Sequence, residues 1–425
     1  MNFLKSIVAL IGALVFSSAV WAADSAAASS LSVYPIQDPL IATITSAINH
    51  TDVPYKIIKV EPLPQRRTVP LLENMNQVAL SYFSQPNPKA PLAFVISGVG
   101  GSGLSGSSLL IAGDLNKQGF AVVTLPDPVN WQYVLGVSRS GVPGYLPQDV
   151  KEYYAFMKFV LKNLKSTQGI KPTQFSVIGY SYGALLTGYL MKEDNSQKFF
   201  NFEKAVLINP AVDLNHGVKT LDGFYAAGNN LTAEQKDFIK GSLLNIGSEL
   251  LSGPGTMQDL LSALQTVPPY TVKHRDWLVG DSFREDLRDV VFATQQIHDI
   301  GLLKKKMTNH HRNARLEEAK TVSFMDYIVK VVLPPIQKKS DTPITTDQLI
   351  ASGGLYPLMD MFANDPRIYM QENANDFLLH DGDLDLLKKT FGDRLRLYPF
   401  GGHIGGLWFP KNRMDLGLIM AAPAQ

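Results

Sequence analysis

The chain has no cysteine among its 425 residues. Disulfide bridges, thiol nucleophiles and cysteine-ligated zinc sites are therefore excluded, and stability must come from the packed core alone. A lipid-modified N-terminus of the bacterial lipoprotein type is excluded for the same reason, because it requires a cysteine at the cleavage site.

An excess of charge of one sign is also lacking. The chain has 39 Lys and Arg against 38 Asp and Glu, for a formal net charge of +1. This balance argues against electrostatic binding of nucleic acid. There is no P-loop, no internal repeat and, beyond the N-terminus, no apolar run long enough to span a bilayer. A hydrophobic content of 45% indicates instead a globular protein with a sizeable core.

Residues 1–22 have the pattern of a signal peptide. A short basic start is followed by the apolar stretch Ser6–Val20, and Val20-Trp21-Ala22 supplies the small residues that a signal peptidase reads. The alternative is a membrane anchor, for which the apolar run is short. We expect export, to a bacterial periplasm or the medium, with residues 23–50 forming a flexible N-terminal segment.

Strand and helix patterns alternate through much of the remaining chain. Continuous apolar, β-prone runs cover Pro91–Ser97, Phe120–Leu125, Phe175–Ile178 and Lys204–Pro210, and Val150–Lys165 has helical spacing. Buried strands separated by helices predict a mostly parallel central sheet with helices on both faces, that is, an α/β fold.

The pattern changes at about residue 214. Residues 214–363 form mostly helical, amphipathic segments that are too long for a crossover, which predicts a helical cap or lid insertion. The predicted α/β core therefore has two parts, 51–213 and 364–425. Within the first part, Trp131–Pro147 is predicted to be a loop that reaches over the site.

The most informative motif is Gly179-Tyr180-Ser181-Tyr182-Gly183, which reads G-x-S-x-G. It lies between a predicted strand and a predicted helix, which is the context of a nucleophile elbow. The alternative is an ordinary tight turn of an α/β protein. In the functional interpretation Ser181 is the nucleophile, because the helix N-terminus directs N–H groups at an oxyanion formed beside it.

A serine hydroxyl needs a general base, and the base needs an orienting acid. His403 lies just past a predicted strand and between glycine pairs, so it is the candidate base. In the order Ser…Asp…His the acid lies between the two, and Asp376 follows the strand at Arg367–Met370. Asp213, just beyond an earlier strand, is the second choice.

The oxyanion hole needs two preformed N–H donors. The backbone of Tyr182 is one candidate, and Val99 in the glycine-rich turn Gly98–Gly103 is the other. This turn formally contains G-x-G-x-x-G, so dinucleotide binding is the alternative. The acidic residue that such a site wants about 20 residues further on is missing, however. No cofactor and no metal are expected.

Together these residues resemble the α/β-hydrolase superfamily of serine hydrolases. The resemblance rests on the elbow at Ser181, the acid position at Asp376, Gly-Gly-His at His403 and the turn at Gly98–Gly101, and one departure is Ser97, where many members have histidine. It implies an esterase or lipase-like enzyme with a helical lid that cleaves small or lipid-like esters through an acyl-enzyme. A peptidase or amidase of the same fold, and a binding protein without turnover, are the alternatives.

Overall fold

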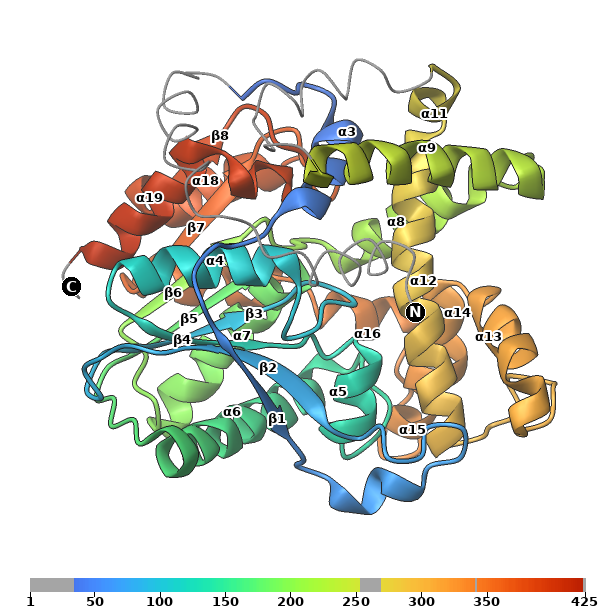
Figure 1. Ribbon diagram of the computed structural model, residues 1–425, viewed down its shortest axis with the longest axis horizontal. Coiled ribbons are helices and arrows are strands. Elements are labelled where there is room, and N and C mark those ends of the chain that lie inside the picture. Colours follow the sequence, from blue (N-terminus) through green and yellow to red (C-terminus); the bar gives the residue numbers. More distant parts are fainter. Residues whose placement is uncertain (1–33, 253–268, 341, 423–425) are drawn as a thin grey trace.

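A central β-sheet organises the molecule, of which the computed structural model describes residues 34–252, 269–340 and 342–422 (Figure 1). Within these residues the sheet has eight strands, of which β1 and β2 pair antiparallel to their neighbours and the others are parallel. In their order across the sheet the strands are β1 (Lys56–Val60), β2 (Val78–Phe83), β4 (Ala121–Leu125), β3 (Leu92–Ile96), β5 (Phe175–Tyr180), β6 (Lys204–Ile208), β7 (Ile368–Asn373) and β8 (Leu395–Tyr398).

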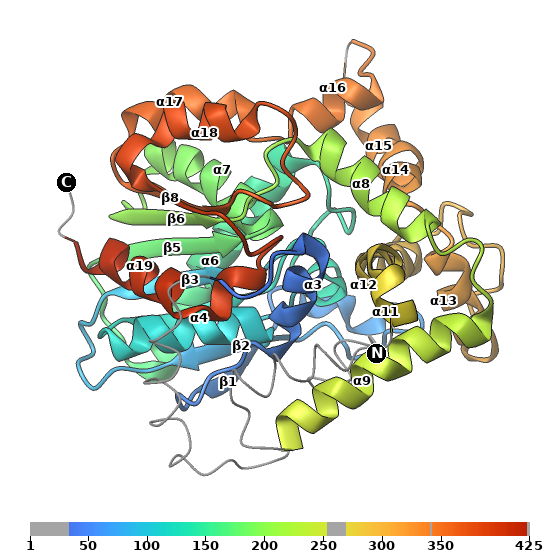
Figure 2. The same ribbon diagram turned by 90° about the horizontal axis from the view of Figure 1, so that it is seen from above.

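Helices cover both faces of this sheet. On one face α4 and α19 pack together, and on the other α6 packs on α7 and α17 packs on α18 (Figure 2). Every residue of β3, β4, β5 and β6 is buried, as the continuous apolar runs require. The core helices are α3 (Pro39–Ile44), η1 (Thr45–Ile48), η2 (Pro64–Thr68), α4 (Gly106–Lys117), α5 (Trp131–Gly136), α6 (Leu146–Gln168), α7 (Tyr182–Gln197), α17 (Met359–Asn364), α18 (Asp383–Phe391), η6 (Gly392–Arg394), η7 (Gly405–Trp408) and α19 (Pro410–Ala421).

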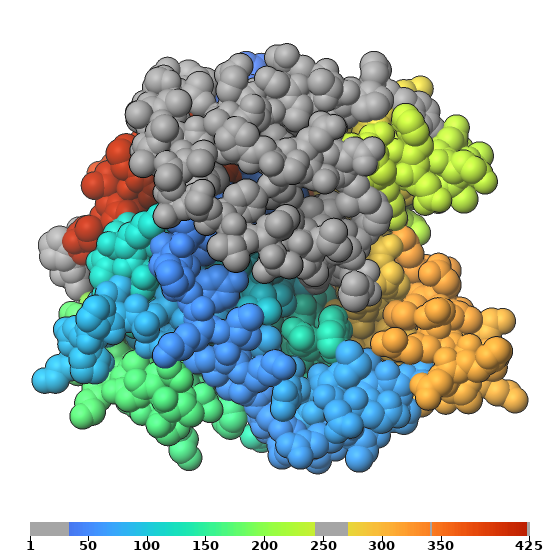
Figure 3. All heavy atoms as spheres, in the orientation of Figure 1, coloured from blue at the N-terminus to red at the C-terminus, as the bar shows by residue number. Residues whose placement is uncertain are grey.

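The helices from α8 to η5, which follow β6, form what we call the cap, whereas α17, the last helix before β7, packs on α18 and belongs to the core. In the space-filling view the part of the cap from α12 to α13, in gold and orange, forms the lower right of the molecule (Figure 3). The cap helices are α8 (Leu214–Ala226), α9 (Ala233–Ser252), α11 (Pro269–Lys273), α12 (Arg275–Ile297), η3 (Asn309–His311), α13 (Arg312–Lys320), α14 (Phe324–Tyr327), the π-helical η4 (Ile328–Val332), α15 (Leu333–Gln337), α16 (Thr346–Ala351) and η5 (Tyr356–Leu358).

Helix α12 is the axis of the cap. It packs on α8 and α13, and its buried Asp281 pairs with Lys240 of α9 at 2.5 Å and with Lys320 of α13 at 3.0 Å. A buried carboxylate needs such partners, since an unpaired one would pay the full cost of desolvation. The three helices are therefore tied together by charge as well as by apolar packing.

The prediction of an α/β fold with a mostly parallel sheet and a helical insertion is confirmed. The prediction of a loop over Trp131–Pro147 was wrong at both ends. Asn130 caps a short helix, α5, by accepting a hydrogen bond from the N–H of Gln132, and α6 already begins at Leu146. The expected signal peptide, residues 1–22, lies outside the described residues. Residues 34–50 were predicted to be flexible, but α3 and η1 form there because Asp38 caps α3 and Tyr34 is buried. Within the described residues, none of the helices combines the length and apolarity that a bilayer span requires.

Candidate active site

Ser181 occupies a sharp turn between a strand and a helix. β5 ends at the residue before it and α7 begins at the residue after it. Its backbone angles, φ 57° and ψ −128°, are costly for a residue that carries a side chain, and such strain is typical of functional turns. The turn places Ser181 at the carboxyl edge of the sheet and at the positive end of the α7 dipole.

The side chains of Ser181, His403 and Asp376 form a continuous hydrogen-bonded series, which we call the triad. His403 Nε2 lies 2.8 Å from Ser181 Oγ, and His403 Nδ1 lies 2.8 Å from Asp376 Oδ2. All three are buried, and His403 has no exposed surface. With a proton on Nδ1, the ring donates to the carboxylate and leaves Nε2 free to accept the serine proton. The structure thus brings together the three residues that the sequence suggested.

Asp213, the second candidate for the acid, lies at the start of α8 and not beside the imidazole. It caps α8, where its Oδ1 accepts hydrogen bonds from the backbone N–H groups of Asn215 at 2.8 Å and His216 at 3.1 Å. In the part of the chain that the structure describes, no hydrogen bond or ion pair joins Asp213 to His403. The acid beside the imidazole is therefore Asp376.

The glycine-rich turn after β3 contacts Ser181. A Cβ built on Gly98 would lie 2.8 Å from the Cβ of Ser181, so only glycine fits at this contact. Among the described residues, neither the N–H of Val99 nor that of Tyr182 has a hydrogen-bond acceptor. Ser97, which departs from the family pattern, is fully buried and donates its hydroxyl to the carbonyl of Ser102 at 2.9 Å. It therefore stabilises the turn instead of facing Ser181.

Searches with the whole chain found no matching family model and no matching curated protein. Solved structures do match. A Pseudomonas aeruginosa protein described as a probable hydrolytic enzyme is 13% identical, with 88% of this chain and 96% of that chain covered and a TM-score of 0.40. A fungal esterase from Rhizomucor miehei is 14% identical, with 95% of each chain covered and a TM-score of 0.39. An esterase from the archaeon Pyrobaculum calidifontis is 14% identical, with 98% and 95% covered and a TM-score of 0.38.

The strand order, the serine at a strand-to-helix turn and the chain order Ser…Asp…His are decisive for the fold. The chain has the α/β-hydrolase fold. As in the predicted arrangement, its helical cap is inserted between β6 and β7.

Behind the triad acid lies a buried polar network that sequence reasoning missed. Asn209, at the end of β6, donates from Nδ2 to Asp376 Oδ2 at 3.1 Å and also to Glu372 Oε1. Asn373 in turn donates to Asn209 Oδ1 at 3.2 Å, which holds the amide group of Asn209 in this orientation. The available sequence signal was a glutamate in strand β7, in which every residue is buried.

The carboxyl group of Glu372 is almost fully buried. Burial raises its pKa well above the ordinary 4.5, and the neighbouring negative charge of Asp376 raises it further. The folded protein therefore holds a proton at Glu372 that the unfolded chain releases at lower pH. Protonation keeps a second negative charge away from Asp376.

We predict a pH-dependent stability difference between the wild type and Glu372→Gln. A group whose pKa is raised by folding contributes stability below its unfolded pKa and loses it as the pH rises through the folded value. The wild type is therefore expected to lose stability relative to the glutamine variant as the pH rises above about 4.3. Urea unfolding at pH 5 and pH 8 measures this, with the exposed Glu317→Gln as control. A difference that stays constant over this range would contradict the assignment.

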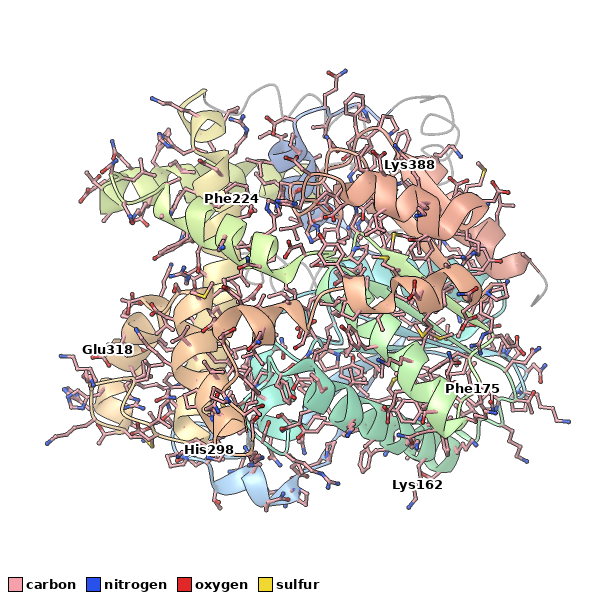
Figure 4. All side chains as sticks on the ribbon, turned by 180° about the vertical axis from the view of Figure 1, so that it is seen from behind. Lys162, Phe175, Phe224, His298, Glu318 and Lys388 are labelled. Carbon is pink, nitrogen blue, oxygen red and sulfur yellow. The ribbon has the colours of Figure 1, made fainter. Side chains whose placement is uncertain are left out.

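The cap reaches the site at two points. Gly100 of the glycine-rich turn packs against Asp286 of α12, since a Cβ built on that glycine would lie 2.0 Å from Asp286 Cγ. Phe224 of α8 contacts the ring of Phe377 at a centroid distance of 5.2 Å, and Phe377 contacts His403 at 5.6 Å (Figure 4 labels Phe224). A cap side chain therefore borders the glycine-rich turn directly, and another reaches the imidazole only through Phe377. Across the described residues, no group of three or more His, Asp or Glu side chains is arranged to hold a metal ion.

Proposed function

We propose that the protein is an exported serine hydrolase that cleaves carboxylic esters through an acyl-enzyme. The observation that carries the proposal is the triad, in which Ser181 Oγ and Asp376 Oδ2 each lie 2.8 Å from one nitrogen of the buried His403 ring. A serine next to an oriented imidazole is an activated nucleophile. Export rests on the signal-peptide pattern of residues 1–22.

In the proposed reaction, Ser181 Oγ attacks the ester carbonyl carbon while His403 Nε2 takes the hydroxyl proton. The C–O bond to the leaving group breaks, and the imidazolium returns the proton to the departing alcohol. Water then attacks the acyl-enzyme carbonyl carbon and loses a proton to His403. The C–O bond to Ser181 breaks, the imidazolium returns the proton to Ser181 Oγ, and the carboxylic acid leaves. The N–H groups of Tyr182 and Val99 are the proposed donors to the oxyanion. Asp376 stabilises the imidazolium in both halves.

A small apolar cavity supports a short acyl group. It has a volume of about 40 Å³ and lies between Tyr182 of the elbow and cap residues that include Leu214, Val218 and Ile328. A cavity of this volume can hold about three water molecules. A long acyl chain needs a much larger volume. Esters of short acids are therefore the first substrates to test.

Cleavage of an amide next to a positively charged group is the second candidate function. It is favoured by Asp286, whose carboxylate lies against the glycine-rich turn at Gly100. A carboxylate there would attract an ammonium group and repel an acidic substrate. Esters and aminoacyl amides of matched acyl size separate the two candidates, and Asp286→Asn is expected to lower activity only on the cationic substrates.

The decisive experiment is labelling with a fluorophosphonate, followed by mass spectrometry to locate the modified residue. The wild type is expected to be labelled at Ser181, and Ser181→Ala is expected to show no labelling. The matched control is Ser176→Ala, because Ser176 lies in β5 and both serines are 5% exposed. This control should be labelled like the wild type. A folded wild type that resists labelling would overturn the proposal and favour a binding protein of this fold.

A further inference from the structure

The segment Tyr34–Asn49, which we call the N-terminal clasp, contacts the loop that carries His403. The backbone N–H of His403 donates to Thr43 Oγ1 at 2.9 Å, although the two residues are 360 positions apart. The Thr43 hydroxyl donates in turn to the carbonyl of Pro39 at 2.7 Å. Because it accepts from one side and donates to the other, this hydroxyl has a fixed direction. The triad histidine is therefore held at its backbone by a side chain from the clasp.

Glycines on both sides of His403 let the clasp approach closely. A Cβ built on Gly402 would lie 2.0 Å from the carbonyl oxygen of Pro39, and one built on Gly405 would lie 2.1 Å from that of Ala42. Contacts this short leave no room for a side chain. The sequence pattern Gly-Gly-His-x-Gly-Gly thus has a packing reason as well as the backbone freedom expected from the sequence.

Further hydrogen bonds extend the contact on both sides. The Tyr34 hydroxyl donates to the carbonyl of Gly405 at 3.0 Å, and Trp408 Nε1 donates to Thr45 Oγ1 at 2.9 Å. The side chain of Asn375, the residue before the triad acid, donates to the carbonyl of Gln37 at 2.9 Å. The clasp therefore holds the loops of both His403 and Asp376.

The same segment also contacts the cap. Asp38 forms an ion pair with Arg275 at the start of α12, at 2.8 Å, and Ile44 packs against the buried cluster that contains Trp277. Figure 2 shows α3 between α12 and the C-terminal part of the core, in agreement with its contacts to α12 and η7. One short segment thus touches the histidine loop, the acid loop and the cap.

We propose that Thr43 is a positioning residue for His403 and that the N-terminal clasp holds the triad in its reactive geometry. This inference rests on the proposed function, because it assigns a role within the same site. A displacement of a reacting group by about 1 Å can cost on the order of 10²-fold in rate. A hydrogen bond to the histidine backbone restricts such a displacement directly.

The test compares second-order rates of fluorophosphonate labelling at Ser181 in full-length variants. Thr43→Val keeps the shape but removes the hydroxyl, and it is expected to lower the rate about 10- to 100-fold. Thr43→Ser restores the hydroxyl and should return the rate to within about twofold of the wild type. The control is Thr390→Val on α18, because Thr390 and Thr43 are both 8% exposed. Thermal unfolding of each variant shows whether it is folded.

The outcomes separate the clasp from the proposed function. Equal labelling of the wild type and a folded Thr43→Val would overturn the positioning role alone, whereas no labelling of the wild type would overturn both. If Thr43→Val and Thr43→Ser were both labelled slowly, the hydroxyl would not be the cause, and this result would also count against the positioning role. If Thr43→Val does not fold, Tyr34→Phe decides, because it removes the hydroxyl that donates to Gly405 and lies 3.5 Å from Thr45 Oγ1. It is then expected to lower the rate at least threefold, and an unchanged rate would overturn the proposal.

Discussion

Replacing Asp376 by asparagine is expected to lower kcat/KM about 10³- to 10⁴-fold while the protein stays folded. Asparagine has the same shape but no charge, so it cannot stabilise the imidazolium that forms when His403 takes the serine proton. Its amide can also donate to Nδ1, which would favour the tautomer that carries the proton on Nε2. Hydrolysis of a short ester and labelling at Ser181 both measure the loss.

Asp213→Asn is the matched control for this prediction. Both aspartates follow strands at the carboxyl edge of the sheet, but Asp213 caps α8 and hydrogen-bonds locally. Asparagine caps helices about as well as aspartate, so stability and activity should both stay near those of the wild type. If Asp213→Asn lost the activity and Asp376→Asn kept it, the acid assignment would be wrong.

Local sequence patterns were sufficient for the strands and for the nucleophile turn. β5 and α7 flank Ser181 so closely that the strand-to-helix turn could be predicted from five residues. The position of Asp376 could be predicted because the parallel strands end at one edge of the sheet. Asp213 also follows a strand at this edge of the sheet, so the sequence alone allowed it as the acid too. Only the tertiary structure, in which Asp376 contacts His403, separates the two.

The supporting residues could not be predicted from the sequence. Asn209 reaches Asp376 and Glu372 only because β6 and β7 are neighbours in the sheet, and one sequence contains no record of that pairing. Thr43 lies in a segment whose composition suggested flexibility. Its buried contacts depend on a loop 360 residues away. Contacts of this kind stabilise a short segment without leaving a periodic pattern in it.

Gly183, the second glycine of the elbow, packs against the backbone at the end of β3. A Cβ built on it would lie 2.3 Å from the carbonyl oxygen of Ser97 and 2.6 Å from that of Ile96. Both contacts are backbone atoms at the end of β3, in the centre of the sheet, so they cannot move aside as a flexible side chain can. Helix α7 would have to shift instead, and Ser181 and Tyr182 at its start would shift with it.

Gly183→Ala is therefore expected to lower the free energy of unfolding by about 1 to 3 kcal/mol, the usual cost of overpacking. In the molecules that remain folded, labelling at Ser181 is expected to fall by about 10²-fold, because the nucleophile has moved relative to His403. The control is Gly223→Ala in the exposed part of α8, where a Cβ meets nothing within 4 Å. Alanine there is expected to raise the free energy of unfolding by about 0.5 to 1 kcal/mol without changing the labelling rate. Urea unfolding and the labelling rate of the two variants measure both effects. A Gly183→Ala protein with the stability and labelling rate of the wild type would show that the elbow is not packed as described.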